Sequence, residues 1–569
     1  MEIMSREALK SASISQLKKF CEALREEIFQ TVAVRGGHLA SNLGIVELTI
    51  GLHRVFSFPE DKIIFDVGHQ CYVHKLLTGR ANRFFTLRQR HGISGFPKRT
   101  ESEYDSYDTG HAGTSVSAAL GIAKARDLKG EKFQVIALIG DGSLNNGLIY
   151  EALNSLKILN TKILIVLNDN GMSISPTVGG THEVLEDLKG GSSSVEDIAL
   201  FERYGLQYMG VYNANNLEEL LPALEQAKYA LQSNSVLLHV TTRKGQGYAF
   251  CERDPDRTHG ISPAKPEKEY SMALGAELLT MAKRDNRVVA VTAAMTDALG
   301  LRQFFERYPE RAFDVGICEE HASVLSAALA AAGMRPYYAI YSTFLQRAFD
   351  EIIHDVCGQK LPVVFCIDRA GISGSDGETH QGVFDLSYLS MIPNLVVAIP
   401  KNIAEFRAIL RKSISLNGPL AIRYPREGEE GDARAVEFGK FEVLQSTMSD
   451  IIIYAAGERC INLARRVMSL AFNEGISVSL VNACFAKPLD YDLIDSRKEK
   501  YVITIEDNVL RGGIGEAIAH YLCNSDKQVF SFGCADRFIP HGSVSELMEE
   551  FGPSQNAILN CIRECYARG

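Results

Sequence analysis

The 569-residue chain lacks the features that mark membrane, secreted and polyanion-binding proteins. No apolar run approaches the roughly 20 residues that cross a bilayer. The charged start, MEIMSREALKSASISQLKKF, contains no apolar core of signal-peptide length. The 12 cysteines form no CxxC pair, and several lie in apolar runs, as reduced core residues do. A formal net charge of -10 disfavours an overall surface for nucleic acid. These absences predict a cytoplasmic enzyme.

The chain also lacks the common nucleotide-binding loops. No GxxxxGK[ST] stretch is present, and the glycines of RGGIGEAIAH, residues 511–520, have the wrong spacing for a dinucleotide fingerprint. A nucleotide-binding protein is therefore a weak interpretation. The glycines near Gly512 are expected instead to pack the start of a helix in the last domain.

The length exceeds what one hydrophobic core usually supports, so about two to four domains are expected. Short runs rich in branched apolar residues alternate with helical patterns, which predicts parallel sheets covered by helices. Two polar segments without a clear period, 242–270 and 426–440, are interpreted as linkers. The expected fold class is three consecutive parallel-sheet α/β domains, at 1–266, 267–430 and 431–569.

The stretch IGDGSLNNGLIYEALNSLKILNTKILIVLNDNGMS, residues 139–173, is a βαβ pattern with polar residues at both strand ends. Asp141 follows the first strand between two glycines, and Asn170 follows the second. Because ligands collect at the carboxyl ends of parallel strands, both side chains are expected in one crevice. Carboxylate, amide and carbonyl oxygens suit Mg2+, which often keeps positions for phosphate oxygens. Asp141, Asn170 and the Met172 carbonyl are the predicted magnesium ligands, with Mn2+ as an open alternative.

Seven further stretches of the sequence narrow the possible protein families. In chain order they are GHLASNLGIVELTIGLH, FDVGHQCYVHKLLTGR, DTGHAGTSVSAALGIA, FDVGICEEHA, YSTFLQRAFDEIIHDV, IDRAGISGSDGETHQGVFDLSYL and AIRYPR. With GDG and NDN they resemble the thiamine diphosphate enzymes. Their order resembles the 1-deoxy-D-xylulose-5-phosphate synthase family, from about residue 35 to beyond residue 540. The resemblance implies two thiamine diphosphate-binding folds, a transketolase C-terminal domain, and a homodimer.

The resemblance implies bound thiamine diphosphate with Mg2+ and assigns residues to each part of the cofactor. Glu319 matches the acid that hydrogen-bonds the pyrimidine, whereas Glu320 is given no catalytic role. Phe344 matches the aromatic residue that stacks on the pyrimidine. The residues implied around the diphosphate and its metal are His69, Gly110, His111, Ala112, Gly113, Gly140, Asp141, Gly142, Ser143, Asn170, Met172 and Lys244.

Four histidines, each close to a glycine in the sequence, are candidate proton-transfer groups, because the pKa of imidazole lies near working pH. They are His38, His69, His259 and His380, which the resemblance places around the reacting atoms. A second set resembles the family's site for the acceptor sugar phosphate, where guanidinium forks suit a phosphate dianion. It comprises Tyr341, Arg347, Arg369, Asp376, His380 and Arg423. An ordinary interdomain ion pair is the alternative interpretation of these arginines.

The implied reaction joins the two carbons left after decarboxylation of pyruvate to D-glyceraldehyde 3-phosphate, giving 1-deoxy-D-xylulose 5-phosphate and carbon dioxide. That product opens the non-mevalonate isoprenoid route and feeds thiamine and pyridoxal synthesis. Two alternatives stay open. One is a transketolase-like or acyloin-forming enzyme with another donor or acceptor, and the other is a non-catalytic paralogue that binds the cofactor.

The chain departs from the family pattern after GMSIS. Relatives carry a much longer segment there, which borders the active site, whereas only residues 176–205 fill it here. Relatives also carry a DGHD stretch where this chain has VYNANNLEE, residues 211–219. The shorter segment bears on how decarboxylation is gated and on which acceptor is preferred.

Overall fold

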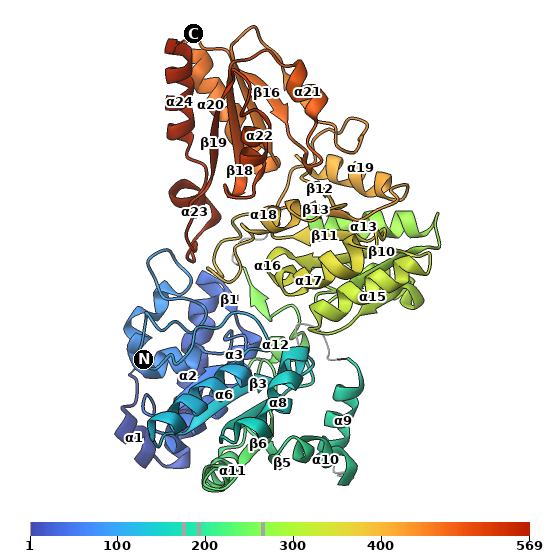
Figure 1. The fold of residues 1–569 in the computed structure, drawn as a ribbon. Helices are drawn as coiled ribbons and strands as arrows, with labels where there is room; N and C mark the ends of the chain where they lie inside the picture. The colour runs from blue at the N-terminus through green and yellow to red at the C-terminus, as the bar shows by residue number, and fades with distance from the viewer. Residues whose placement is uncertain (1, 173–177, 191–194, 263–267, 569) are drawn as a thin grey trace. The chain divides into compact units, whose positions relative to one another are not determined.

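The computed structural model describes residues 2–172, 178–190, 195–262 and 268–568 (Figure 1). It divides into two compact units. Unit 1 comprises Met1–Lys265 with Gly316–Cys318, and unit 2 comprises Pro266–Val315 with Glu319–Gly569. None of the described helices is both long enough and apolar enough to cross a membrane.

Unit 1 contains a five-stranded sheet in which every neighbouring pair is parallel. In spatial order its strands are β2 (Lys62–Phe65), β3 (Val135–Gly140), β4 (Leu164–Asp169), β6 (Ser235–Thr241) and β5 (Leu206–Asn213). Successive residues of a strand point to opposite faces, so both faces of this apolar sheet must be covered. In β3, Ile136 and Leu138 enter one core cluster, whereas Val135, Ala137 and Ile139 enter another.

Helices cover both faces of the unit 1 sheet. The first core cluster contains residues of α1 (Arg6–Ser11), α2 (Ile14–Arg35), α3 (Ala40–Gly44), α4 (Val46–Val55), α5 (Tyr72–Lys75), α11 (Leu217–Ala230) and α12 (Ala249–Arg253). The second contains residues of α6 (Ser115–Lys129), α7 (Asp141–Leu144), α8 (Gly147–Leu159), α9 (Gly180–Lys189) and α10 (Val195–Arg203). Helices α6 and α8 lie side by side (Figure 1).

The segment 242–270, predicted to be the linker that closes the first domain, contains two short elements of unit 1. Helix α12 spans Ala249–Arg253, and β7 (Gly260–Ile261) pairs antiparallel with β1 (Gly37–His38). Residues 263–267 of that segment lie outside the described residues. These elements are too short to show a period in the sequence, and the first stretch of unit 1 ends within this segment, at Lys265.

The first sheet of unit 2 has seven strands, and all its pairs are parallel except the one at an edge. Its spatial order is β17 (Phe485–Lys487), β12 (Val396–Ala398), β13 (Leu420–Arg423), β11 (Val364–Asp368), β10 (Arg335–Tyr341), β8 (Val288–Thr292) and β9 (Ala312–Asp314). The α-helices between these strands are α13 (Tyr270–Ala282), α14 (Arg302–Arg307), α15 (Glu319–Ala331), α16 (Ser342–Leu345), α17 (Phe349–Glu351), α18 (Asp385–Ser390) and α19 (Ile403–Ser413).

The second sheet of unit 2 has five strands, in the order β14 (Glu442–Gln445), β16 (Ser479–Asn482), β15 (Ile451–Ala456), β18 (Tyr501–Val509) and β19 (Gln528–Cys534). Only the edge strand β14 is antiparallel to its neighbour. Its helices are α20 (Glu458–Asn473), α21 (Tyr491–Ser496), α22 (Ile514–Tyr521), α23 (Val544–Phe551) and α24 (Gln555–Arg568).

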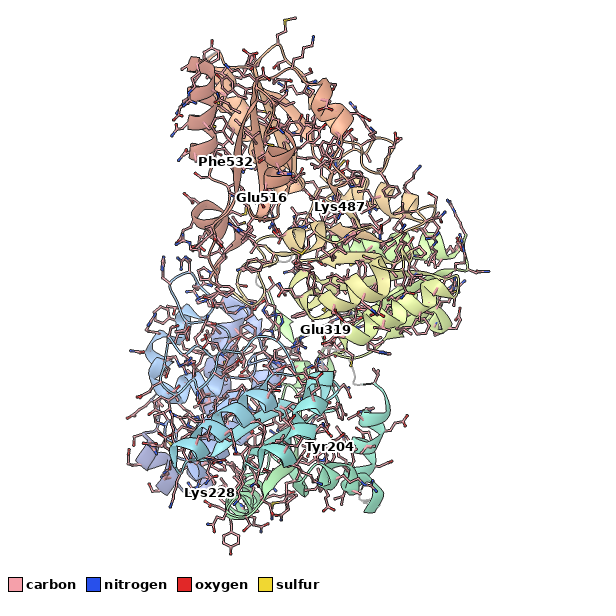
Figure 2. The ribbon with its side chains drawn as sticks, viewed as in Figure 1. Tyr204, Lys228, Glu319, Lys487, Glu516 and Phe532 are labelled. Carbon is pink, nitrogen blue, oxygen red and sulfur yellow. The ribbon has the colours of Figure 1, made fainter. Side chains whose placement is uncertain are left out.

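Strand β17 links the two sheets of unit 2, because it follows β16 in the chain but pairs with β12 of the first sheet. Lys487 of β17, labelled in Figure 2, donates hydrogen bonds to the carbonyls of Ser390 and Ile392 at 3.0 and 2.5 Å. The predicted parallel α/β architecture is confirmed in the three larger sheets of the described residues. The predicted packing role of the glycine stretch is also supported, because Gly515 of α22 lies against Thr504 and Ser531.

Glycines in helix interiors provide a matched test of the packing. A Cβ on Gly275 of α13 would lie 1.9 Å from the carbonyl oxygen of Gly300, whereas one on Gly121 of α6 would meet no atom within 4 Å. Gly275→Ala is expected to lower the stability by about 1–3 kcal/mol, because the backbone must shift. Gly121→Ala is expected to raise it by up to ~1 kcal/mol through helix propensity. Thermal unfolding of both variants checks the signs, and equal shifts would contradict this packing.

Candidate active site

The ends of β3 and β4 bring two predicted metal ligands together in unit 1. The parallel register pairs Gly140 with Asn168, so Asp141 and Asn170 follow neighbouring strand ends. The Asn170 amide nitrogen lies 3.5 Å from Oδ1 of Asp141. Asp141 is buried, and the buried Oδ1 of Asn170 accepts no hydrogen bond from the chain. A buried oxygen without a donor needs a partner, so this pair fits a hard cation.

Open space adjoins these oxygens. A Cβ on Gly140 would meet nothing within 4 Å. Among the residues that the structure describes, no group of three or more His, Cys, Asp and Glu could hold a metal. A cation at this edge would therefore depend on amide and carbonyl oxygens beside the single carboxylate of Asp141. Met172, whose carbonyl is the third predicted ligand, lies half-buried two residues after Asn170.

Asp169, between the two asparagines of NDN, has a different role from Asn170. Its Oδ2 lies 3.1 Å from Nε2 of His239, and its Oδ1 accepts hydrogen bonds from the Gly171 amide and from Lys189. Burial alone would raise the pKa of Asp169, but the hydrogen bond of His239 and the charge of Lys189 outweigh it and lower that pKa. Asp169 therefore fixes the turn that carries Asn170.

The glycine loop 110–113 is held by a residue that the sequence interpretation missed. Asp66, at the end of β2, accepts hydrogen bonds from the amides of Gly113 and Ser115 at 2.9 and 3.1 Å. Gly113 has a φ of 88°, and a Cβ there would lie 2.3 Å from Oδ1 of Asn146. These contacts fix the entry to α6, where backbone N–H groups and the helix dipole suit an anion.

Lys244 lies close enough to Asp141 for their charges to interact. Burial lowers the pKa of Lys244 to about 8, while Asp256 and Asp141 oppose that shift. A buried cation near the end of β3 fits an anionic ligand, which would offset its desolvation. His111 lies half-buried in the glycine loop.

Three predicted histidines form one cluster in unit 1. The ring centroids of His38, His69 and His259 lie 5.2 to 5.4 Å apart. The β1–β7 pair brings His259 beside His38, and Ser41 Oγ lies 3.2 Å from Nδ1 of His259. Burial lowers the pKa of His259 well below its ordinary value, assisted by the positive charge of Lys244 and by the other two histidines. His259 is therefore a neutral imidazole at physiological pH.

Asn42 orients this cluster and was also missed. Its Nδ2 donates to the carbonyls of His38 and His69, both at 2.7 Å, and its Oδ1 accepts from the amide of Tyr72. Tyr72 in turn accepts from the His38 amide at 3.2 Å. Asn42 lies within GHLASNLG, so its motif was found, although its hydrogen bonds to the distant segment 69–72 gave no sequence signal.

Glu319, at the start of α15 in unit 2, is buried (Figure 2). Its Oε2 accepts no hydrogen bond from the chain and lies 3.6 Å from Nη1 of Arg347. Burial raises the pKa of Glu319, although the charge of Arg347 opposes the shift. A carboxyl group of this kind keeps its proton at higher pH and can donate a hydrogen bond to a ring nitrogen.

Aromatic and basic side chains form a stack beside the end of β10. The rings of Tyr341 and Phe344 stack at 5.6 Å, and His380 meets Phe344 edge-on at 5.5 Å. The guanidinium of Arg369 lies 4.6 Å from the Tyr341 ring centroid. Thr379 Oγ1, 2.9 Å from Nδ1 of His380, fixes the orientation of the imidazole. Three predicted acceptor-binding residues and the predicted pyrimidine-stacking residue therefore lie together.

The two predicted phosphate-binding arginines have different surroundings. Arg369 donates to Oδ1 of Asp368 at 2.7 Å, with 16% of its side chain exposed. Arg423 is enclosed: its Nε donates to Asp385 at 3.0 Å, and its Nη2 donates to the carbonyls of Gly382 and Asp507. Arg369 has the surroundings of a ligand-binding group, whereas the predicted phosphate contact of Arg423 stays a prediction.

Comparison with known proteins assigns the chain to a family. A 1-deoxy-D-xylulose-5-phosphate synthase model matches residues 1–197. A protein with that name from Clostridium tetani is 43% identical over 97% of both chains, and one from Caldanaerobacter subterraneus is 44% identical over 99% of both. The chain belongs to the 1-deoxy-D-xylulose-5-phosphate synthase family.

Two further family models match segments of unit 2, and solved structures match nearly the whole chain. The transketolase pyrimidine-binding domain matches residues 267–428, and the transketolase C-terminal domain matches residues 439–558. Among solved structures, the transketolase of Campylobacter jejuni is 18% identical over 97% of this chain and all of that chain, with a TM-score of 0.44. The transketolase of Leishmania mexicana is 17% identical over 98% of both chains, also with a TM-score of 0.44.

The predicted departure from other synthase-family members lies partly outside the described residues. Within 176–205, α9 and α10 are described, whereas Pro176, Thr177 and residues 191–194 are not. The alignment with the Clostridium tetani protein runs over 602 positions while covering 97% of this 569-residue chain. That relative therefore carries residues with no counterpart here.

Asp169 gives a testable consequence. Asp169→Ala leaves His239 and the Gly171 amide without their acceptor, so the free energy of unfolding at neutral pH is expected to fall by about 3 kcal/mol or more. Because the pKa of Asp169 is lowered in the folded protein, its contribution is lost as the pH falls, and the two proteins should converge below about pH 4. Denaturant unfolding measures both effects. Asp187→Ala, on the exposed face of α9, is the control, and an equal loss there would contradict this role.

Proposed function

We propose that this chain joins pyruvate to D-glyceraldehyde 3-phosphate in a thiamine diphosphate-dependent decarboxylative condensation. The products are 1-deoxy-D-xylulose 5-phosphate and carbon dioxide, and the former serves isoprenoid and thiamine synthesis. The observation that carries the proposal is the 42–44% identity to proteins named 1-deoxy-D-xylulose-5-phosphate synthase over at least 95% of the chain. The geometry supports it, because the surroundings of Asp141 and Asn170, of the histidine cluster and of Glu319 suit the tasks predicted for them.

Unit 1 carries the groups for the diphosphate end of the cofactor. Asp141, Asn170 and the Met172 carbonyl would hold Mg2+, and Lys244 would offset the negative charge of the phosphates. Backbone amides at the start of α6, fixed by Asp66, would bind phosphate oxygens. The histidine cluster, oriented by Asn42, would place imidazoles near the reacting atoms and exchange protons with the substrate.

Unit 2 carries the groups for the pyrimidine and the acceptor. When bound, thiamine diphosphate supplies the carbanion equivalent that makes the new carbon–carbon bond. Glu319 would hydrogen-bond the pyrimidine and Phe344 would stack on it. Arg369 and Tyr341 would bind the phosphate of the acceptor, which holds its aldehyde in place. His380, fixed by Thr379, would transfer a proton at the acceptor oxygen.

Two parallel incubations separate the alternatives. Purified protein is incubated with thiamine diphosphate, Mg2+ and D-glyceraldehyde 3-phosphate, with either pyruvate or a ketose phosphate as donor, and the product is identified by mass spectrometry and NMR. A transketolase-like enzyme would turn over the ketose phosphate and leave pyruvate unchanged. A non-catalytic paralogue would bind the cofactor without turnover. Retention of Asp141, Asn170 and Glu319 in the expected surroundings supports the synthase.

A homodimer is part of the proposal. Helix α15 packs against the helical segment Ile352–Cys357 (η5), and each exposes an apolar side chain, Val324 at 41% and Ile353 at 38%. Exposed apolar side chains on packed neighbouring elements suit an interface. Light scattering should give twice the chain mass of 62.7 kDa.

Glu319→Gln tests the buried acid. The amide keeps the shape of the side chain but cannot share a carboxyl proton with the pyrimidine, so kcat is expected to fall by about 10²–10⁴-fold. Glu320→Gln changes the neighbouring residue and should leave kcat within about twofold, because that side chain is given no role. Steady-state kinetics measure both, and normal turnover in Glu319→Gln would exclude the assignment.

Asp141→Asn tests the cation site separately from catalysis. Removing the only carboxylate among the proposed ligands should weaken Mg2+-dependent binding of thiamine diphosphate by at least about tenfold, or ~1.4 kcal/mol. Isothermal titration calorimetry with and without Mg2+ measures the change, with Asp187→Asn as the control. Unchanged affinity would place the metal elsewhere.

A further inference from the structure

The predicted acceptor-binding residues Arg369, Asp376 and His380 lie on one loop, residues 369–382. Its neck is closed by two backbone hydrogen bonds between Gly371 and Gly382, at 2.6 and 2.8 Å. Within the loop, the Gln381 side chain accepts from the amides of Ser373 and Gly374 and donates to the Gly374 carbonyl. The loop is therefore internally fixed.

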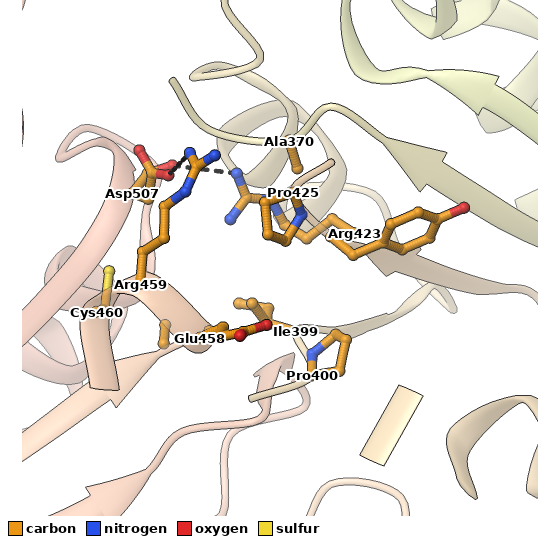
Figure 3. Close-up of a pocket in the computed structure, with 12 residues that line it drawn as sticks. Ala370, Ile399, Pro400, Arg423, Pro425, Glu458, Arg459, Cys460 and Asp507 are labelled. Atoms are coloured by element: carbon orange, nitrogen blue, oxygen red, sulfur yellow. Dashed lines mark hydrogen bonds and ion pairs between the residues drawn. The ribbon is translucent and has the colours of Figure 1, made fainter. Parts of the chain in front are cut away.

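Two charged residues of the C-terminal sheet bind the backbone of that neck. Asp507 of β18 accepts a hydrogen bond from the Ile372 amide at 3.1 Å, and Arg459 of α20 donates to the Ile372 carbonyl at 2.6 Å. The two side chains also pair with each other at 3.1 Å, as Figure 3 shows. Both backbone groups of Ile372 are thus satisfied by residues from outside the loop.

Asp507 lies so close to the backbone of the neck that only glycine fits at position 371. Gly371 has a φ of 75°, and a Cβ there would lie 1.9 Å from Oδ2 of Asp507. Further along the loop, Gln381 donates to the carbonyl of Pro540 at 3.1 Å, again in the C-terminal part. Ile372 and Val383 share one apolar cluster with residues of the C-terminal part, among them Val509 and Ile539. Asp507, Arg459, Pro540 and the C-terminal residues of this apolar cluster therefore form the surface against which the loop packs, here termed the seat.

Arg423, on β13 of the first sheet of unit 2, contacts both the loop and the seat. It donates to the carbonyls of Gly382 and Asp507, so the neck and the seat share a buried cation. Figure 3 shows the bond to Asp507. A cavity of about 20 Å³, room for one water, lies among Arg423, Glu458, Arg459 and Asp507. Buried hydrogen-bonded ions fix geometry, because any displacement leaves a charge without its partner.

We propose that Asp507 and Arg459 are positioning residues for the acceptor substrate. They hold the neck of loop 369–382 from the C-terminal sheet and thereby fix Arg369, Asp376 and His380 against Tyr341 and Phe344. This inference rests on the proposed function. It gives the C-terminal sheet, which carries none of the predicted catalytic residues, a role in binding the phosphorylated aldehyde.

The test compares substrates in Arg459→Met and Asp507→Asn. Each variant loosens the neck, so the KM for D-glyceraldehyde 3-phosphate should rise about tenfold or more. The KM for pyruvate and the dissociation constant of thiamine diphosphate should stay within about twofold, because the proposed function assigns Arg369 and His380 to the acceptor and the cofactor to other elements. Arg459→Lys, which keeps one donor nitrogen, should recover part of the affinity for D-glyceraldehyde 3-phosphate. Arg563→Met is the matched control, since Arg563 of α24 pairs with Glu474 through side chains that are 46% and 39% exposed.

The outcomes separate this inference from the proposed function. If the wild type makes no 1-deoxy-D-xylulose 5-phosphate, the proposed function fails and this inference with it. If the wild type is active and both variants keep the wild-type KM for D-glyceraldehyde 3-phosphate, the positioning role of Asp507 and Arg459 is excluded, whereas the proposed function stands. Equal losses for pyruvate, cofactor and acceptor, or loss of the folded state in both variants, would show a purely structural role and also overturn it.

Discussion

The parallel pairing of β3 with β4 is the constraint on which the unit 1 site depends. Parallel strands end at the same sheet edge, and the register of Gly140 with Asn168 sets the separation of the residues that follow. Both strands are apolar and buried on two faces, so polar side chains are tolerated only where the strands end. The sheet that forms the core thereby also places a carboxylate and an amide at one point.

Burial of these polar groups requires a second set of residues that satisfies the loops around them. Asp66 binds the glycine loop, Asn42 binds the carbonyls of two histidines, and Asp169 binds the turn before Met172. Each accepts or donates through a side chain at the end of a strand or within a short helix. A buried backbone group without a partner costs free energy, so these contacts stabilise loops that have no regular structure of their own.

Much of the site was predictable because its residues lie in short motifs at strand ends. Branched apolar runs located the strands, and GDG and NDN then located Asp141 and Asn170. The supporting residues were not predictable in the same way. Asp66 lies within FDVGHQ, but its bonds to Gly113 and Ser115 join segments distant in the chain. Likewise, β17 has three residues and pairs with a sheet that precedes it by a long segment, which no local period reveals.

Backbone strain marks the same strand ends. Val67 after β2 and Arg369 after β11 both have a positive φ, 58° and 60°, a conformation that is unfavourable for side chains with a Cβ. Such residues cost of order 1–3 kcal/mol each and persist only where neighbouring contacts hold them. Asp368 does so for Arg369, because its Oδ1 accepts from both the amide and the guanidinium of that residue, at 2.6 and 2.7 Å.

This difference in support explains why Arg369 and Arg423, which look equivalent in sequence, behave differently. Arg369 is held by one neighbouring carboxylate and one aromatic face, which leaves part of its guanidinium exposed. Arg423 is bound by a carboxylate and two carbonyls within the fold, so a phosphate that took it would have to compete with the contacts that join the two sheets. Because breaking a buried ion pair costs several kcal/mol, the partly exposed Arg369 is more accessible to a ligand than the enclosed Arg423.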